Sequence, residues 1–295
     1  MSRFMLQWEI TQKDEGRLIR DFLKLHEISK AALTDIKFKG GEISVNHQEV
    51  TVRYSLKSGD CLRIYFPPEE PSEGVKGEKV PLSIVYEDDY VMVVQKPAGM
   101  STIPSREHPS GSLANGLVGY YEKQGLKATA HIVTRLDRDT SGLVLIAKHR
   151  HIHHLLGKQQ KMHGVRRTYE ALVHGSLKEK EGTVEEPIAR KSTSIIEREV
   201  NRNGQYACTH YRVLHTYPSF THIELSLETG RTHQIRVHMS YVGHPLLGDD
   251  LYGGDENLIK RQALHCCRLS FQHPIAKKEL MFEAELPIDM ANLMK

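Results

Sequence analysis

The chain has 295 residues, of which 39% are hydrophobic and 26% charged, and its formal net charge is +3. This length favours two domains, and the mild excess of positive charge permits a polyanionic partner without requiring one. No apolar run approaches the roughly 20 residues of a membrane helix, and residues 1–4 lack the apolar stretch of a signal peptide. The four cysteines lack the spacing of a disulfide framework, so we expect reduced thiols in a cytoplasmic protein.

Residues 1–66 form the first predicted unit, which is compact and basic. Apolar side chains recur at helical spacing over residues 16–23, and Ser29 is a candidate N-cap for a second short helix. Two β segments with turns follow, at residues 43–47 and 56–64. The basic side chains of the helical part are Arg17, Arg20, Lys24, Lys30, Lys37 and Lys39. This charge fits a small nucleic-acid-binding module and, equally, a solvated helix face.

Residues 67–80 are a predicted linker, because proline, glycine and acidic residues dominate and no hydrophobic period is present. Residues 81–295 form the larger predicted domain, in which strands outnumber helices. We therefore expect an α+β fold with a mixed, mostly antiparallel central sheet. The expected strands lie within residues 82–94, 143–148, 167–173, 207–214, 221–227, 264–271 and 280–286, and the expected helices within 113–124 and 149–163.

The first candidate site lies in residues 131–142, directly before the apolar strand. Asp137 stands between Arg135 and Arg138, and nearby positive charge keeps a carboxylate ionised. Residues 139–142 are typical of a tight turn. An ionised, positioned aspartate can act as a nucleophile, a base or a metal ligand. A structural salt-bridge turn explains these residues equally well.

A second cluster lies in residues 229–239, which we expect to be a loop that opens a helix, and it consists of Arg231, His233, Arg236 and His238. Helix N-termini and guanidinium groups both suit phosphate oxygens. The cluster predicts a clamp on an RNA backbone, with one arginine paired to Asp137, and the alternative is a solvated helix face. Tyr169 lies on an alternating strand, where it either stacks on an RNA base or packs in the core.

Two further patterns have competing interpretations. The histidines at residues 149–154 include a pair one helical turn apart, but no carboxylate or cysteine lies near them in sequence. We therefore predict no metal site there and favour a basic helix that faces RNA. Asp137 and Asp139 also resemble the Asp-x-Asp motif of haloacid-dehalogenase-type phosphatases. In this chain the apolar strand follows the motif instead of preceding it, so phosphatase activity is the second choice.

The motifs taken together resemble the RluA/RluD family of RNA pseudouridine synthases, and residues 1–66 resemble an S4-type RNA-binding domain. The resemblance covers almost the whole chain. This chain departs from the family pattern at Thr134, where the family usually has histidine, and at residues 101–104. The stretches that carry it are residues 88–100, 135–143, 169–175, 229–238, 243–253, 264–265 and 273–274.

The resemblance implies that specific uridines in ribosomal or transfer RNA are isomerised to pseudouridine, with no cofactor and no metal. It makes Asp137 the nucleophile, or the base in a glycal route, and lets Tyr169 stack on the uracil. Arg236 is the expected partner that keeps Asp137 charged, with Arg231 as the next candidate. Arg135 would fill the gap left by the flipped nucleotide.

The resemblance also assigns substrate contacts to Arg231, His233, Thr140 and Lys96. RNA is the only partner that it requires, no membrane is involved, and a monomer is the default state. A different class of function, an RNA-binding protein without enzymatic activity such as a ribosome-assembly factor, is the alternative.

Overall fold

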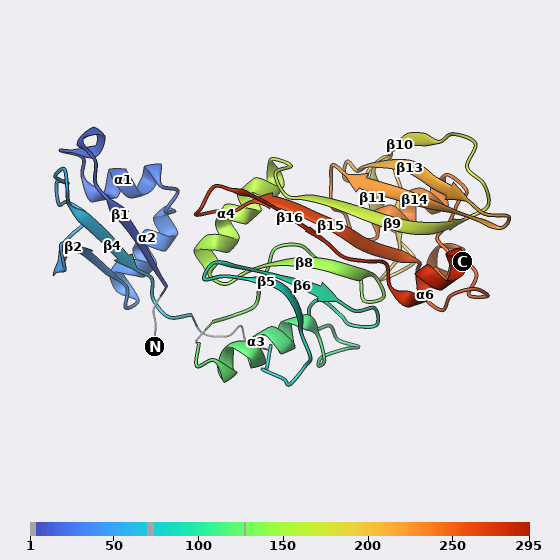
Figure 1. The fold of residues 1–295 in the computed structure, drawn as a ribbon, viewed down its shortest axis with the longest axis horizontal. Coiled ribbons are helices and arrows are strands. Elements are labelled where there is room, and N and C mark those ends of the chain that lie inside the picture. The colour runs from blue at the N-terminus through green and yellow to red at the C-terminus, as the bar shows by residue number, and fades with distance from the viewer. Residues whose placement is uncertain (1–3, 70–73, 127) are drawn as a thin grey trace.

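The computed structural model describes residues 4–69, 74–126 and 128–295. Two main sheets come from separate stretches of chain, a four-stranded sheet near the N-terminus and a ten-stranded sheet after it. Figure 1 shows the smaller sheet as a blue module beside the longer body of the molecule. Each sheet has its own buried apolar cluster.

The N-terminal module places two helices against a sheet of order β1-β4-β2-β3. Its elements are β1 (Met5–Glu9), α1 (Ile19–Leu25), α2 (Lys30–Phe38), β2 (Glu42–Val45), β3 (Gln48–Glu49) and β4 (Cys61–Tyr65). The predicted N-cap is confirmed, because the Ser29 hydroxyl accepts a hydrogen bond from the Ala32 N–H at 3.1 Å. Strand β1 was not predicted; it forms through a long-range pairing in which Met5 lies opposite Tyr65.

The large sheet has the strand order β10-β13-β14-β9-β15-β8-β6-β5, with β7 and β16 paired at its side. Only the pairing of β8 with β15 is parallel among the described strands, so the predicted mixed, mostly antiparallel α+β fold is confirmed. The strands are β5 (Ser83–Glu87), β6 (Val91–Lys96), β7 (His131–Ile132), β8 (Ser141–Ala147), β9 (Arg166–His174), β10 (Glu181–Glu185), β13 (Cys208–Thr216), β14 (Phe220–Leu227), β15 (Leu264–Gln272) and β16 (Glu279–Glu283).

Strand β8 lies in the middle of this sheet, and all seven of its residues are buried. The apolar run of the sequence explains this, because a strand buried on both faces needs no polar alternation. At its start Gly142 has φ +120°, and a Cβ there would lie 2.3 Å from the carbonyl oxygen of Cys266. Glycine is therefore required where β8 approaches β15, and this contact anchors the loop that carries Asp137.

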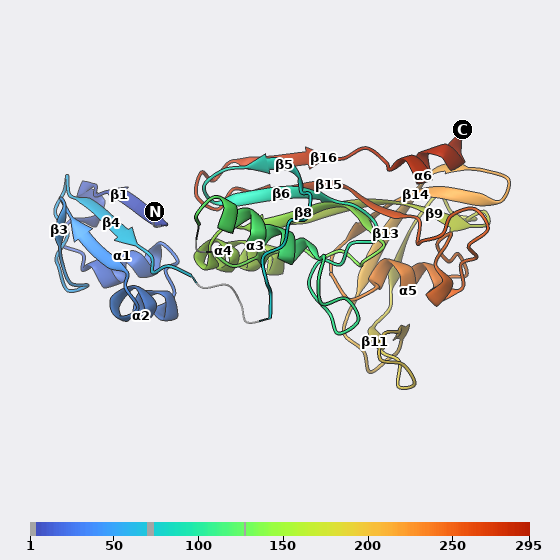
Figure 2. The ribbon, with the colours of Figure 1, turned by 90° about the horizontal axis from the view of Figure 1, so that it is seen from below.

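The helices of the larger body are α3 (Leu113–Lys123), α4 (Arg150–Lys161), α5 (Gln234–Tyr241) and α6 (Ile288–Ala291). Figure 2 shows α3, α4 and α5 on the same side of the large sheet. A separate hairpin of β11 (Ile188–Arg190) and β12 (Arg198–Val200) projects from that side. Among the residues described, no helix combines the length and the apolar character needed to cross a membrane.

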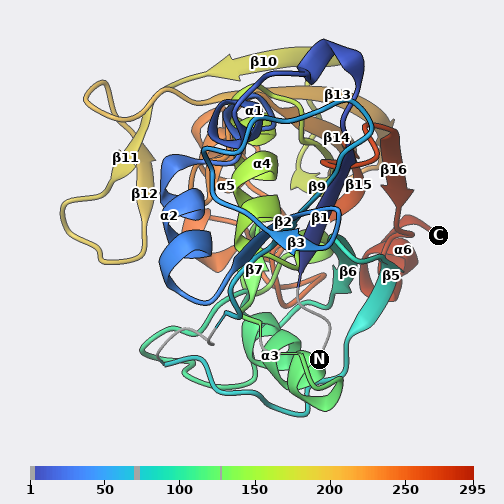
Figure 3. The same cartoon turned by 90° about the vertical axis from the view of Figure 1, so that its left-hand side faces the viewer.

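Helix α4 is the part of the larger body next to the N-terminal module in Figure 1, and it lies behind the module in the end-on view of Figure 3. The ring of Phe4 stacks on His149 with a centroid separation of 3.7 Å, and Arg150 forms an ion pair with Asp35 at 3.2 Å. Lys158 also pairs with Glu27. Acidic groups of the module thus pair with two cations of this helix, and the prediction that the helix faces RNA stays a prediction.

The predicted linker, residues 67–80, forms hydrogen bonds with the larger body in both of its described pieces. Glu69 accepts a hydrogen bond from the Arg150 N–H at 2.8 Å and also bonds the His131 ring. Further along, the Asn115 side chain donates to the Lys76 carbonyl oxygen at 2.9 Å. Residues 70–73 of the linker lie outside the described residues. The linker therefore contacts the larger body both before and after residues 70–73.

Candidate active site

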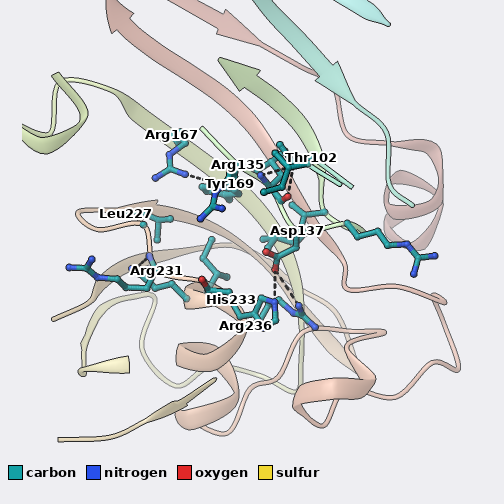
Figure 4. A pocket seen from close by; sticks show the side chains of 18 of the residues that line it. Thr102, Arg135, Asp137, Arg167, Tyr169, Leu227, Arg231, His233 and Arg236 are labelled. Atoms are coloured by element: carbon teal, nitrogen blue, oxygen red, sulfur yellow. Dashed lines mark hydrogen bonds and ion pairs between the residues drawn. The ribbon is translucent and has the colours of Figure 1, made fainter. Parts of the chain in front are cut away.

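A cavity of about 610 Å³ opens where the loop before β8 meets β9 and the start of α5. Figure 4 shows that side chains from these three elements point into it. Seven of the nine predicted site residues line the cavity: Arg135, Asp137, Thr140, Tyr169, Arg231, His233 and Arg236. His238 does not, because its side chain is fully buried and bonds Thr209 and the Glu186 carbonyl oxygen. The fold therefore brings together residues that are up to about a hundred positions apart.

Asp137 pairs with a cation from a different element. Its Oδ2 atom lies 3.2 Å from an η nitrogen of Arg236 and 3.9 Å from Nε2 of His233. The structure thus contains the predicted pair with Arg236. No ion pair joins Asp137 to Arg135 or Arg138 within the described part of the chain; Arg138 instead lies 3.9 Å from Asp139. The expectation that the sequence neighbours cage this carboxylate is therefore wrong, because its cation comes from α5 instead.

Arg236 is held by a second carboxylate that the sequence analysis missed. Its Nε and its other η nitrogen donate to the two oxygens of Asp249, each at 2.7 Å. Asp249 is fully buried, and the guanidinium carbon of Arg236 lies 4.9 Å from the ring centre of Tyr252. Burial disfavours the charge of Arg236, but Asp249 and Asp137 outweigh it and raise its pKa. The result is a permanent, oriented cation beside Asp137.

His233 occupies the turn that precedes α5, with φ 57° in the left-handed region. Its Nδ1 lies 2.8 Å from the Tyr252 hydroxyl. Burial lowers the pKa of His233 although the charge of Asp137 opposes this shift, so the ring is neutral at pH 7. A neutral imidazole near Asp137 leaves Arg236 as the cation that pairs with this carboxylate.

Tyr169 forms part of the cavity wall, and its side chain is nearly buried, with 4% exposed. Its hydroxyl accepts a hydrogen bond from Arg167 at 3.2 Å. Burial raises the pKa of Tyr169, so the phenol stays protonated. Arg167 was not predicted, yet it precedes Tyr169 by two residues on an alternating strand and therefore shares its face. The tyrosine thus packs in the core and also forms part of the pocket wall, and its stacking on an RNA base stays a prediction.

Hydrogen bonds fix the backbone of the Asp137 loop from several sides. The Thr102 hydroxyl donates to the Leu136 carbonyl oxygen at 2.6 Å. Thr140, which is 2% exposed, accepts from the Gln262 side chain at 3.3 Å, and Arg261 donates to the Asp139 carbonyl oxygen at 3.2 Å. Thr102 lies in the segment that departs from the expected family pattern, and here it supports the loop.

Lys96 does not line the cavity, and its predicted contact with substrate is wrong. The side chain is fully buried, and its ammonium group donates to the carbonyl oxygens of Pro97, Met100 and Arg138 at 2.7–2.9 Å. Burial lowers the pKa of Lys96 to about 7. The lysine links the loop after β6 to the Asp137 loop from inside the protein, where substrate cannot reach it.

A second groove of about 400 Å³ adjoins the cavity and shares Arg135 and Arg231 with it. Arg190 and Arg198 of the β11–β12 hairpin line its other wall. Sequence reasoning missed this hairpin, since its three-residue strands have no clear alternation. Four arginines along one groove make a positively charged path into the cavity.

Comparisons with known proteins agree with this geometry. A family model described as RNA pseudouridylate synthase matches residues 90–241. The uncharacterized RNA pseudouridine synthase YjbO of Bacillus subtilis is 55% identical over 91% of this chain and 95% of its own length. Ribosomal large subunit pseudouridine synthase D of Nitrosomonas europaea is 38% identical over 86% of this chain and 76% of its own length.

A solved structure supports the same assignment. The human protein RNA pseudouridylate synthase domain containing 1 aligns with a TM-score of 0.59 and 26% identity, over 71% of this chain and 85% of that chain. These similarities overturn the phosphatase alternative, because the family match includes the Asp137 loop, β9 and α5. By the extent of these matches, the chain belongs to the RNA pseudouridylate synthase family.

Proposed function

We propose that this protein isomerises specific uridines of RNA to pseudouridine in the cavity that holds Asp137. One observation carries the proposal: a half-buried carboxylate lies 3.2 Å from a permanently charged arginine at an open cavity of about 610 Å³. That volume is within the range of roughly 300–1,000 Å³ typical of small-molecule sites. A single nucleotide fits such a space, whereas a stacked duplex does not.

The reaction conserves atoms and electrons. The C1′–N1 bond of uridine breaks, the uracil turns, and C1′ forms a new bond to C5. The C5 proton leaves to solvent and N1 gains one, so no oxidant, reductant or cofactor is needed. Asp137 attacks C1′, attacks the pyrimidine ring, or removes a proton in a glycal route. Each route requires the ionised carboxylate that Arg236 stabilises.

The neighbouring side chains suit the other parts of the reaction. The protonated ring of Tyr169 stacks on the uracil and keeps the freed base from escaping. Arg135 is exposed at the cavity, where it takes the place of the flipped nucleotide and offsets the few kcal/mol of unstacking. Thr140, Arg231 and His233 complete the wall that contacts the nucleotide.

Two basic regions supply affinity for the rest of the RNA. The groove of Arg190 and Arg198 receives the strand next to the flipped nucleotide, since guanidinium groups suit phosphate oxygens. The S4-like N-terminal module adds exposed basic side chains on α1 and α2, namely Arg20, Lys24, Lys30 and Lys37. We also propose that the protein is cytoplasmic, since its RNA substrate is made there. We propose that it acts as a monomer, because one chain supplies every residue of the site.

Replacement of Asp137 tests the chemistry. We expect Asp137→Asn to reduce tritium release from RNA tritiated at uridine C5 by more than about 1,000-fold, because the reacting group is removed. RNA affinity should stay within about threefold of the wild type. Asp139→Asn is the matched control, because Asp139 lies in the same loop and does not contact Arg236. Turnover by Asp137→Asn would show that another group reacts.

Large-subunit ribosomal RNA is the substrate that we propose, since the relative from Nitrosomonas europaea is named for the large ribosomal subunit. Transfer RNA is the alternative. Pseudouridines should be mapped in both RNAs from cells with and without the gene. Loss of sites from ribosomal RNA supports the proposal; loss from transfer RNA alone contradicts the substrate and leaves the chemistry standing.

A further inference from the structure

Three potential metal ligands meet on the sheet surface at one end of β13, outside the catalytic cavity. Cys208 and His210 are two residues apart on β13, so their side chains leave the same face. Glu228, directly after β14, bonds backbone to backbone with Cys208 at 3.3 Å. One ligand atom from each residue lies within 4.8 Å of the other two. Neighbouring strands therefore bring a thiol, an imidazole and a carboxylate together.

The distances suit a tetrahedral ion. The Cys208 sulfur lies 3.7 Å from Nε2 of His210. Bonds of about 2.3 Å to sulfur and about 2.0–2.1 Å to nitrogen place two tetrahedral ligands roughly 3.5 Å apart. Oε1 of Glu228 lies 2.8 Å from the same nitrogen, closer than two ligands of one ion. Its side chain is 48% exposed, so it can retreat by the fraction of an ångström that an ion requires.

The surroundings of His210 orient it for metal binding. Its Nδ1 lies 2.8 Å from the hydroxyl oxygen of Thr183 on β10. When Nδ1–H donates to that oxygen, Nε2 is left unprotonated and faces the Cys208 sulfur, which is the usual arrangement of a metal-binding histidine. On the same strand Glu185 lies directly opposite Cys208 in the β10–β13 register. Residues directly opposite each other in a strand pair project from the same face, so the exposed side chain of Glu185 lies on the face that carries Cys208.

We propose that Cys208, His210 and Glu228 bind one divalent transition metal ion of the zinc class, with Glu185 or water in the fourth position. A thiolate with an imidazole selects zinc over magnesium or calcium, which prefer oxygen ligands alone. The ion would tie β10, β13 and β14 together. It would also steady Thr229, which accepts from the Cys208 N–H at 3.1 Å and leads into the loop of Arg231. The proposal does not depend on the isomerase assignment.

Cobalt substitution tests the site in the full-length protein. After chelation and dialysis under reducing conditions, Co²⁺ should bind one equivalent and give a sulfur-to-cobalt charge-transfer band together with intense tetrahedral bands. Zn²⁺ should displace it and raise the thermal midpoint. Cys208→Ser should lose the charge-transfer band, and Glu228→Gln should weaken Co²⁺ binding by about tenfold or more.

Matched controls separate metal binding from folding. Cys61→Ser removes the half-buried thiol on β4 and should bind Co²⁺ like the wild type. Glu228→Gln changes an exposed group, so the fold is kept even where Cys208→Ser disturbs a buried position. The proposal is overturned when the wild type shows no charge-transfer band at one equivalent. Unchanged affinity in Glu228→Gln, together with an unchanged band in Cys208→Ser, overturns it as well.

Discussion

Asp249 is fully buried and binds Arg236 through both of its oxygens, so it sets the direction of the cation that faces Asp137. We expect Asp249→Asn to lower kcat more than it raises KM, because the residue positions Arg236 and does not touch RNA. Removing one partner of a buried pair also costs about 3–5 kcal/mol of folding free energy. Single-turnover kinetics and denaturant unfolding measure the two effects. Asp250→Asn, at the exposed neighbouring position, should leave both unchanged.

Lys96 gives a second prediction at this scale. Lys96→Met keeps the length of the side chain but leaves the carbonyl oxygens of Pro97, Met100 and Arg138 without their donor. Each buried, unpaired group costs about 1–3 kcal/mol, so the unfolding free energy should fall by at least about 2 kcal/mol. RNA affinity should change little, since the ammonium does not reach the cavity. Calorimetry measures the unfolding free energy, and filter binding measures the RNA affinity. A large loss of RNA affinity would indicate that Lys96 contacts the RNA after all.

Local sequence patterns predict some of the side-chain contacts in the site and not others. The turn motif and the helix start, both of which are local patterns, predicted that one arginine pairs with Asp137, and the family resemblance singled out Arg236, which the structure pairs with it. The partnership of Arg236 with Asp249 depends on how the loop after α5 folds back, which no local spacing encodes. The sequence places Lys96 beside a loop but does not reveal whether its amine faces the cavity or the protein interior. The tertiary packing that buries Lys96 decides this orientation.

At the scale of elements, strand β8 was predicted from its unbroken apolar run, and helices α3 and α4 were predicted from helical spacing over more than ten residues. The two-residue strand β7 and the β11–β12 hairpin were missed. Such short strands are stabilised by hydrogen bonds and side-chain contacts with the strands they pair with, so their own few residues do not predict them. The missed hairpin supplies one wall of the groove and thus part of the proposed RNA path.

Substitution in the hairpin tests that path. The double change Arg190→Gln and Arg198→Gln should weaken RNA binding and reduce the slope of log affinity against log salt by about one for each phosphate that is no longer neutralised. KM should rise more than kcat falls. Arg212→Gln on β13, where the side chain is 61% exposed and pairs with Glu224, is the control and should leave the slope unchanged. An unaltered slope in the double variant would place the RNA elsewhere.

At the scale of the whole molecule, two histidines join the N-terminal module to the larger body. His149 stacks on Phe4, and His151 stacks on Phe66 with a centroid separation of 5.4 Å. Burial lowers the pKa of both histidines to about 4, against an ordinary value of 6.5. They are therefore neutral when folded, and between pH 6.5 and pH 4 the unfolded chain binds more protons than the folded one.

Stability should accordingly be constant, as far as these histidines contribute, above pH 6.5 and should decrease as the pH falls from 6.5 toward 4. The slope is about 1.4 kcal/mol per pH unit for each histidine. Urea unfolding at a series of pH values measures it, and His151→Phe should flatten the curve. His154→Phe, at an exposed position of the same helix, serves as the control. Equal slopes in the wild type and His151→Phe would contradict the prediction.

The position of β15 has a consequence for how the protein is made. This strand, Leu264–Gln272, lies between β8 and β9, although both of those neighbours leave the ribosome long before it. During synthesis the nascent chain must hold two open strand edges apart until the late strand arrives. Pairings so distant along the chain form slowly. Termination of synthesis before residue 264 would therefore yield an inactive, aggregation-prone polypeptide. A chaperone that shields the exposed edges of β8 and β9 would increase the yield of folded enzyme.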